Sequence, residues 1–186
     1  MGMRRAVPRP DGGPEASDDP SPPVYQLPES FDEFYAREYA GLVRLALVLS
    51  GSRHAAEDLA QDALLAAYRD WSRLVQPLAW TRRVVANMAA SAVRRRVVEV
   101  RVLARLAVRR DEVVQELPAE DEEFWAAVRS LPKRQGQMVA LYYLEDCSVA
   151  EIAAILDCAE GTVRATLHKG RAALARRLRV ADREEP

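Results

Sequence analysis

The chain has 186 residues, of which 49% are hydrophobic, 6% aromatic and 30% charged, and its formal net charge is −1 at pH 7. This length suffices for one medium-sized domain or two small ones. No apolar run approaches the ~20 residues of a membrane span. The two cysteines and two histidines have no disulfide or zinc spacing. We therefore expect a cytoplasmic protein with reduced thiols, no membrane insertion, no metal and no cofactor.

The charges are distributed in blocks along the chain. Glu29–Asp70 is acidic on balance, Arg94–Arg110 contains seven arginines and one glutamate, and the charged residues of Asp111–Glu123 are all acidic. Such blocks say more about partners than the net charge does.

The first predicted helix follows a segment rich in Pro, Gly, Asp and Ser. This segment, residues 1–28, has almost nothing to bury, so we expect a disordered tail. Ser30 and Glu33 have the spacing of a capping box, and Gly51 is a helix-ending signal. The residues predicted to face the core of this helix are Phe34, Tyr35, Tyr39, Leu42, Val43, Leu45, Ala46 and Leu49.

Two more helices are predicted before the arginine-rich block. The second runs from about His54 to Trp71, with acids and an amide on its exposed first half and with Tyr68 and Trp71 in its core stripe. Ser72–Pro77 is predicted to be a loop. The third helix runs from about Leu78 to Arg95, has a basic end, and buries Trp80.

The charge reversal near Arg110 and Asp111 divides the chain. We predict one domain over residues 29–96, a linker over 97–118 whose first part can still be helical, a second domain over 119–180, and a tail over 181–186. No strand pattern is present, so the fold class is all-α, with two small helical domains. We expect the domains to fold separately and to move relative to each other. The alternative is closure by ion pairs between the linker arginines and the acids that follow, and exposed pairs of this kind are weak.

The segment Ser148–Arg171 has the pattern of a helix-turn-helix. Ser148 and Glu151 form a capping box, and Asp157 can adopt the left-handed conformation that the turn requires. The second helix carries a buried stripe at steps of three and four, namely Val163, Leu167, Gly170, Leu174 and Leu178. Small residues on its outer line and cations on both flanks suit a DNA major groove. A structural helical hairpin with a solvated basic face is the other interpretation.

Three segments, in this order, resemble a known family. They are DLAQDALLAAYRDW at Asp58–Trp71, WTRRVVANMAASAVRRR at Trp80–Arg96 and LPKRQGQMVALYYLEDCSVAEIAAILDCAEGTVRATLHKGRAAL at Leu131–Leu174. Together they resemble bacterial RNA polymerase sigma factors of the extracytoplasmic-function (ECF) group, and the Ala and Arg content is similar to that of actinobacterial members. The resemblance implies a non-enzymatic factor that binds core polymerase through its largest-subunit coiled coil and flap region, recognises promoter DNA and helps to melt it. It also allows an anti-sigma factor as a further partner.

The resemblance assigns three groups of residues. The residues expected to bind polymerase are Asp58, Leu59, Gln61 and Asp62. Those expected to bind the −10 element are Arg73, Gln76, Arg82, Arg83, Asn87, Arg94, Arg95 and Arg96, with Asn87 reading an unstacked base. Those expected to bind the −35 element are Thr162, Arg164, Ala165, Thr166, His168, Lys169 and Arg171.

Two other classes of function are weighed against this one. A helix-turn-helix regulator that acts without polymerase needs neither the acidic second helix nor the arginine-rich third helix. An enzyme is not expected, because the sequence has no Gly-rich phosphate loop, no nucleophile elbow and no usable His or carboxylate constellation.

Overall fold

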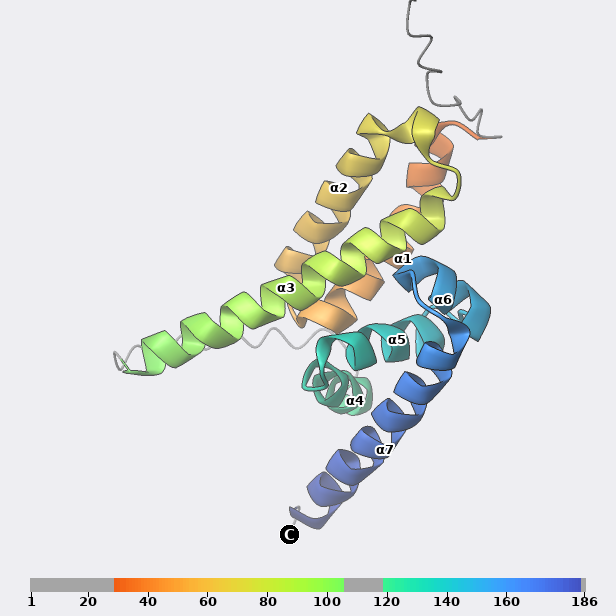
Figure 1. The fold of residues 1–186 in the computed structure, drawn as a ribbon. Helices are drawn as coiled ribbons and strands as arrows, with labels where there is room; N and C mark the ends of the chain where they lie inside the picture. Colours follow the sequence, from red (N-terminus) through yellow and green to blue (C-terminus); the bar gives the residue numbers. More distant parts are fainter. Residues whose placement is uncertain (1–28, 106–118, 185–186) are drawn as a thin grey trace, which may run out of the picture.

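The computed structural model describes residues 29–105 and 119–184 (Figure 1). Over these residues the all-α class is confirmed, because every regular element is a helix. The elements are α1 (Phe31–Ser50), α2 (Arg53–Arg69), the short 3-10 helix η1 (Trp71–Arg73), α3 (Pro77–Arg105), α4 (Ala119–Arg129), α5 (Lys133–Tyr143), α6 (Val149–Leu156) and α7 (Glu160–Glu184). None of the described helices is long and apolar enough to cross a membrane. The predicted N-terminal tail lies outside the described residues.

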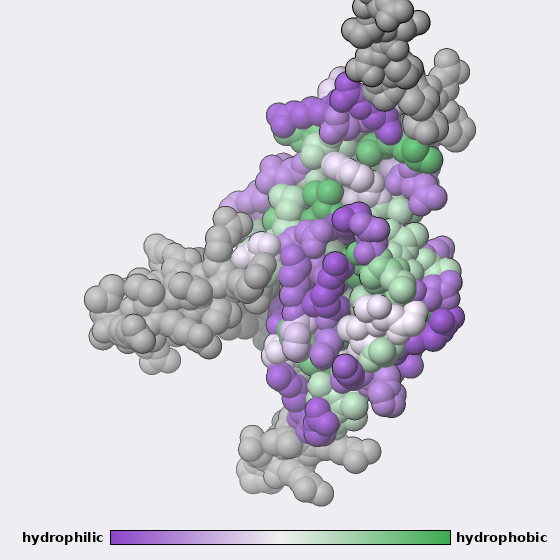
Figure 2. All heavy atoms as spheres, viewed as in Figure 1, coloured by the Kyte–Doolittle hydropathy of each residue, from purple (hydrophilic) through white to green (hydrophobic). Residues whose placement is uncertain are grey.

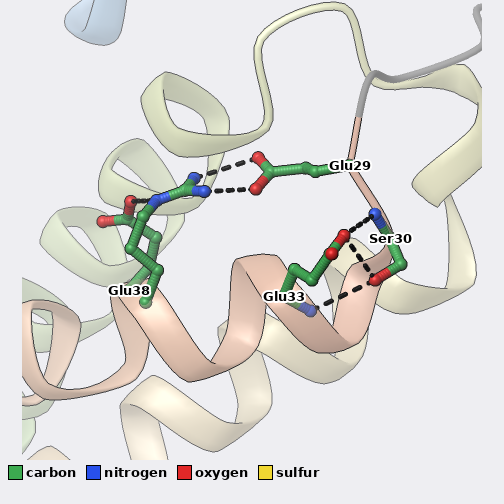
Figure 3. A network of polar contacts seen from close by, with 5 residues as sticks. Glu29, Ser30, Glu33 and Glu38 are labelled. Atoms are coloured by element: carbon green, nitrogen blue, oxygen red, sulfur yellow. Dashed lines mark hydrogen bonds and ion pairs between the residues drawn. The ribbon is translucent and has the colours of Figure 1, made fainter.

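Helix α1 begins and ends where the sequence indicates. The Ser30 hydroxyl accepts a hydrogen bond from the Glu33 amide, and the Glu33 carboxylate accepts one from the Ser30 amide at 2.8 Å (Figure 3). Gly51 ends the helix with φ = 71°, a conformation that other residues adopt at a steric cost. Next to the capping box, the carboxylate of Glu29 pairs with Arg37, and this ion pair holds the pKa of Glu29 below its usual range.

Helices α1, α2 and α3 pack into one bundle. Alanines on α2 are fully buried and let α1 and α3 approach closely: Ala56, Ala60, Ala63 and Ala67. Phe34 fills the core beside Trp71, with ring centroids 5.0 Å apart. Two of the predicted core residues are placed wrongly, because Tyr35 is 39% and Tyr68 60% exposed. Tyrosine at a bundle edge buries part of its ring and keeps its hydroxyl in water.

Helix α3 is longer than predicted at its C-terminal end. Pro77 is its first residue, where a missing amide proton costs nothing, and the Thr81 hydroxyl donates to the Pro77 carbonyl at 2.7 Å. The helix continues to Arg105, which confirms that the first part of the predicted linker, residues 97–118, is helical. The remainder, residues 106–118, lies outside the described residues, as do the side chains of the linker arginines. Among the acids proposed to pair with them, Glu122 is described, and its carboxylate pairs with Arg129 instead.

Helices α4 to α7 form the second unit, and its helix-turn-helix is confirmed. Ser148 and Glu151 make the predicted capping box, and Asp157 ends α6 with φ = 53°. The predicted stripe on α7 is buried at Val163, Leu167, Gly170 and Leu174. At Gly170 a Cβ would lie 3.1 Å from the Val139 side chain, so glycine allows α7 to approach α5 closely.

The two units, which the sequence predicts to move relative to each other, are packed against each other in this structure. Buried residues of both units belong to one contiguous hydrophobic cluster. Contacts join α1 to α4 and α5, and α3 to α5 and α6, and α6 lies beside the N-terminal part of α3 in Figure 1. Arg129 also donates to the Val48 carbonyl at 3.3 Å. The sequence indicated only the linker charges as a possible contact between the two units. In the structure, the folded units themselves make this contact.

Candidate polymerase and nucleic-acid interface

The acidic side of α2 presents three of the four residues predicted to bind polymerase. Asp58, Gln61 and Asp62 are exposed, and His54 lies 3.7 Å from the Asp58 carboxylate. Leu59 is only 7% exposed and packs inward, so its predicted role as a contact residue is not supported by its position. The exposed surface at these positions therefore consists of carboxylate and amide groups.

Apolar residues continue this face, and the sequence analysis missed them. Leu65 is 48% and Tyr68 60% exposed, and both follow Asp58 and Gln61 at helical steps of three and four. An exposed tyrosine beside charged residues is typical of a protein-binding surface. The repeat of exposed positions along α2 is the signal that could have identified them. On the face shown in Figure 2, small hydrophobic areas lie between larger hydrophilic ones.

The predicted −10 residues at the start of α3 are held by the second unit. The guanidinium of Arg82 pairs with Glu145 at 2.5 Å, and Arg83 lies 3.6 Å from Asp157. The Arg82 and Glu145 side chains are only 20% and 7% exposed, so solvent and salt screen this pair far less than a surface pair. Arg82 also donates to the Sγ of Cys147 at 3.8 Å, and burial raises the pKa of that thiol. A thiol of this kind stays protonated and unreactive at neutral pH.

The side chain of Asn87 is also held by a residue of the second unit. The side-chain amide of Gln137, which is fully buried, donates to the Ala86 carbonyl at 3.0 Å and to Asn87 Oδ1 at 3.1 Å. Two polar atoms in this contact lack a hydrogen bond, because Gln137 Oε1 and Arg82 Nε are buried without a partner. Each such atom costs about 1–3 kcal/mol.

The other predicted −10 residues lie on either side of this contact. Arg73, at the end of η1, and Gln76, just before α3, are exposed and line a cleft of about 510 Å³ together with Trp80 and Arg83. Trp80 is half-buried, which agrees with a packing role. Arg94, Arg95 and Arg96 belong to α3, but their side chains lie outside the described residues.

The predicted −35 residues lie on α7 and remain accessible. The exposed ones are Thr162, Arg164, Ala165, His168, Lys169 and Arg171, whereas Thr166 is half-buried. Arg164 pairs with Glu160 one turn earlier at 2.6 Å, and both side chains face solvent. The helix thus presents small residues between cations, as a helix that enters the major groove requires.

Arg171 is held by two tyrosines of α5 that the sequence analysis did not assign. Its Nε donates to the Tyr143 hydroxyl at 2.9 Å, and its guanidinium lies 4.8 Å from the ring centroid of Tyr142. The Tyr143 hydrogen bond raises the pKa of Arg171 above its usual value. A guanidinium fixed in this way loses little further rotamer freedom when it binds phosphate.

Together, the fold and this arrangement define an all-helical protein with an acidic face on α2 in its first unit and a helix-turn-helix with an exposed cationic helix in its second unit. Comparison with known proteins identifies the family. The family model of Sigma-70 region 2 matches residues 34–98, and that of Sigma-70, region 4 matches residues 121–174.

Two relatives and one solved structure illustrate the similarity. The chain is 34% identical over 158 residues to the ECF RNA polymerase sigma factor SigE of Mycolicibacterium smegmatis, with 76% of this chain and 59% of that protein covered. It is 31% identical over 157 residues to SigM of Mycobacterium tuberculosis, with 80% and 77% covered. The sigma factor RpoE of Bartonella quintana, solved in complex with the anti-sigma factor NepR, superposes with a TM-score of 0.64 at 25% identity over 81% of this chain and 97% of that one. The chain belongs to the ECF family of RNA polymerase sigma factors.

Proposed function

We propose that this chain binds core RNA polymerase, directs it to promoters and helps to open the DNA, without catalytic chemistry of its own. The observation that carries this proposal is the order of three surfaces in a chain that matches both sigma regions: the acidic face of α2, the basic start of α3 and the accessible cationic helix α7. Residues 29 to about 105 would dock on polymerase and bind the −10 element. Residues 119 to about 180 would bind the −35 element.

The polymerase surface is proposed to be the stripe of Asp58, Gln61, Asp62, Leu65 and Tyr68 on α2. The acids complement a basic partner surface, such as the coiled coil of the largest subunit, and steer the encounter. The exposed Tyr68 supplies apolar area of the kind that dominates binding energy at interfaces. A second contact with the polymerase flap is proposed for residues 119–180 from the family resemblance.

The experiment that tests this function is run-off transcription with purified core polymerase over a genomic promoter library, combined with a core-binding assay. The double variant Asp58→Arg with Asp62→Arg should abolish core binding and run-off while leaving helicity unchanged, because like charges across an interface cost several kcal/mol. Asp70→Arg makes half of this charge change at the exposed C-cap of the same helix and serves as the control. Wild-type core affinity in the double variant would contradict the docking assignment.

The −10 proposal assigns base reading to Asn87 and strand holding to Arg82, Arg83, Arg73 and Gln76. An amide offers both a donor and an acceptor to a base edge, and guanidinium groups bind phosphates. The −35 proposal assigns base contacts to the start of α7 and phosphate contacts to its flanks. The RpoE relative was solved with an anti-sigma factor, which supports an anti-sigma factor as a further proposed partner.

The alternative, a helix-turn-helix regulator that acts without polymerase, leaves the acidic face of α2 without a role. Co-purification with core polymerase separates the two. A chain that binds promoter DNA alone and never retains core polymerase would favour the regulator.

A further inference from the structure

The start of α7 carries an acid on a helix whose other described charges are cations. Glu160 is the first residue of α7 and the only acid among the described side chains of this helix. Arg164, Lys169 and Arg171 follow it on the exposed surface. DNA presents two walls of phosphates, so an acid at the tip of a DNA-binding helix weakens binding wherever it faces a phosphate or another acceptor. The position of Glu160 therefore favours a contact with a hydrogen-bond donor of the DNA.

Glu160 and Arg164 lie one helical turn apart and form a pair. One terminal nitrogen of Arg164 donates to Glu160 Oε2 at 2.6 Å. This bond uses one of the five N–H donors of the guanidinium and one of the two carboxylate oxygens, so both groups keep capacity for a base. The side chains of Arg164 and Glu160 are 63% and 47% exposed, so base edges can reach them. An arginine held in this way is preorganised for a bidentate contact with guanine.

We propose that Glu160 is a specificity-determining residue, whose carboxylate accepts a hydrogen bond from N4 of a cytosine beside the guanine that Arg164 reads. In the major groove cytosine presents this donor, whereas guanine and thymine present the acceptors O6 and O4, which repel a carboxylate. Adenine presents the N6 donor next to the N7 acceptor and is the weaker match. The inference rests on the proposed −35 role of α7, and it adds the base that the start of this helix selects.

Gly161, the next residue of α7, suits a close approach of the DNA. A glycine inside a helix is less stable than an alanine. Packing does not require it here, because no atom of the described residues lies within 4 Å of a Cβ built at this position. Gly170 differs, since a Cβ there would lie 3.1 Å from the Val139 side chain. Gly161 is exposed, so the first turn of α7 presents bare backbone next to the Glu160 carboxylate.

The alternative role of Glu160 is to stabilise the helix. A carboxylate in the first turn complements the positive end of the helix dipole and can pair with a cation four residues later. Removal of the charge would then change the affinity for every DNA sequence by the same factor. Base reading instead confines the effect to one base-pair position, so the dependence on sequence separates the two roles.

Base reading is tested with the full chain bound to core polymerase and a promoter library with a randomised −35 region, from which the bound templates are sequenced. At one position, wild type should select cytosine over thymine roughly 5- to 150-fold. Glu160→Gln keeps an acceptor for Arg164 and adds an amide donor, so selection at that position should shift towards adenine. Glu123→Gln removes the same charge from the exposed surface of α4 and should change no position. A Glu160→Gln variant with the selection pattern of wild type, or with an equal change at all positions, would overturn the proposal.

Close approach is tested by Gly161→Leu on the selected −35 sequence. The variant should not lower the urea midpoint of unfolding, because leucine propagates a helix better than glycine. It should weaken binding about fivefold or more, the loss expected for one missing base contact. Ala175→Leu adds the same side chain at an exposed position nearer the C-terminal end of α7 and should bind like wild type. Wild-type affinity of Gly161→Leu would overturn the contact of Glu160, which requires the base edge to lie beside this backbone.

Arg164→Ala separates failure of this inference from failure of the proposed function. In the same library it should relax the position at which wild type selects guanine. If wild type selects no −35 sequence and Arg164→Ala changes nothing, the proposed function of α7 fails together with the role of Glu160. If Arg164→Ala relaxes one position and Glu160→Gln relaxes none, the −35 assignment stands and only the role of Glu160 fails.

Discussion

The two proposed DNA surfaces of this chain differ in how they meet solvent. On α7, cations and small residues are exposed and are held by neighbours within their own unit, as Arg171 is by Tyr142 and Tyr143. On α3, Arg82 and Asn87 are half-buried and are held by residues of the other unit. The difference teaches that a surface proposed to read duplex DNA can be preorganised within one unit, whereas the surface proposed for an unpaired strand is covered by the other unit in this structure.

The largest expected effect concerns Asn87, on the covered surface. Asn87→Ala should weaken initiation by ~1–3 kcal/mol for one base identity at one −10 position, if the contact is bidentate. The measurement is run-off transcription with core polymerase over templates that carry each base in turn. It must use the polymerase-bound state, because in the free protein the same change also removes an acceptor from Gln137. An equal loss for all four bases would mean that Asn87 has a structural role.

On the exposed surface of α7, substitutions of Arg164 and Lys169 should affect −35 binding in different ways. Arg164→Ala should relax −35 specificity by up to ~1–3 kcal/mol, since it lies where such helices meet base edges. Its pair with Glu160 is exposed, so its loss should change stability by less than ~1 kcal/mol. Lys169→Ala should weaken all −35 sequences alike and reduce the slope of log affinity against log salt by about one. Salt slopes that are identical in wild type and Lys169→Ala would remove Lys169 from the phosphate contacts.

A smaller effect is expected at the tyrosine that holds Arg171. Tyr143→Phe keeps the ring and removes the hydroxyl that accepts from Arg171 Nε, so −35 affinity should fall by ~0.5–1.5 kcal/mol. Tyr143→Ala should cost more, because the ring also lies 5.6 Å from the guanidinium. The effect of Tyr143→Phe should vanish in an Arg171→Ala background, as a double-mutant cycle would show. Full additivity would mean that Tyr143 does not act through Arg171.

The smallest expected effect concerns the capping boxes, because each unit has a helix that begins with one. Hydrogen bonds from Ser30 lower the pKa of Glu33, and those from Ser148 lower the pKa of Glu151, from an ordinary value of 4.5. A folded pKa below the unfolded one gives stability that is present above pH 4.5 and is lost as the pH falls through the folded pKa. Glu33→Gln and Glu151→Gln keep the capping geometry but should each flatten this acid loss, measured by urea unfolding across pH. An unchanged acid dependence in both variants would contradict the linkage.

Local signals in the sequence determined much of this protein. The capping boxes at Ser30 and Ser148, the glycine at position 51 and the left-handed Asp157 fix helix ends through interactions within a few residues, so they can be read without the fold. The apolar stripe of α7 has the same local character, and so do its exposed cations. The order of the acidic, arginine-rich and helix-turn-helix segments was enough to indicate the family, which the comparisons confirm.

Only the tertiary structure decided what depends on residues far apart in the chain. It turned Tyr68 outward, because the neighbouring helices determine which side of α2 is covered. It placed Gln137 against Asn87 and Glu145 against Arg82, at separations of 50 and more residues. Periodicity states which residues share a face of a helix, but it cannot state which other helix covers that face. The packing of the second unit on α3 follows from shape and buried area, and no short segment of the sequence encodes it.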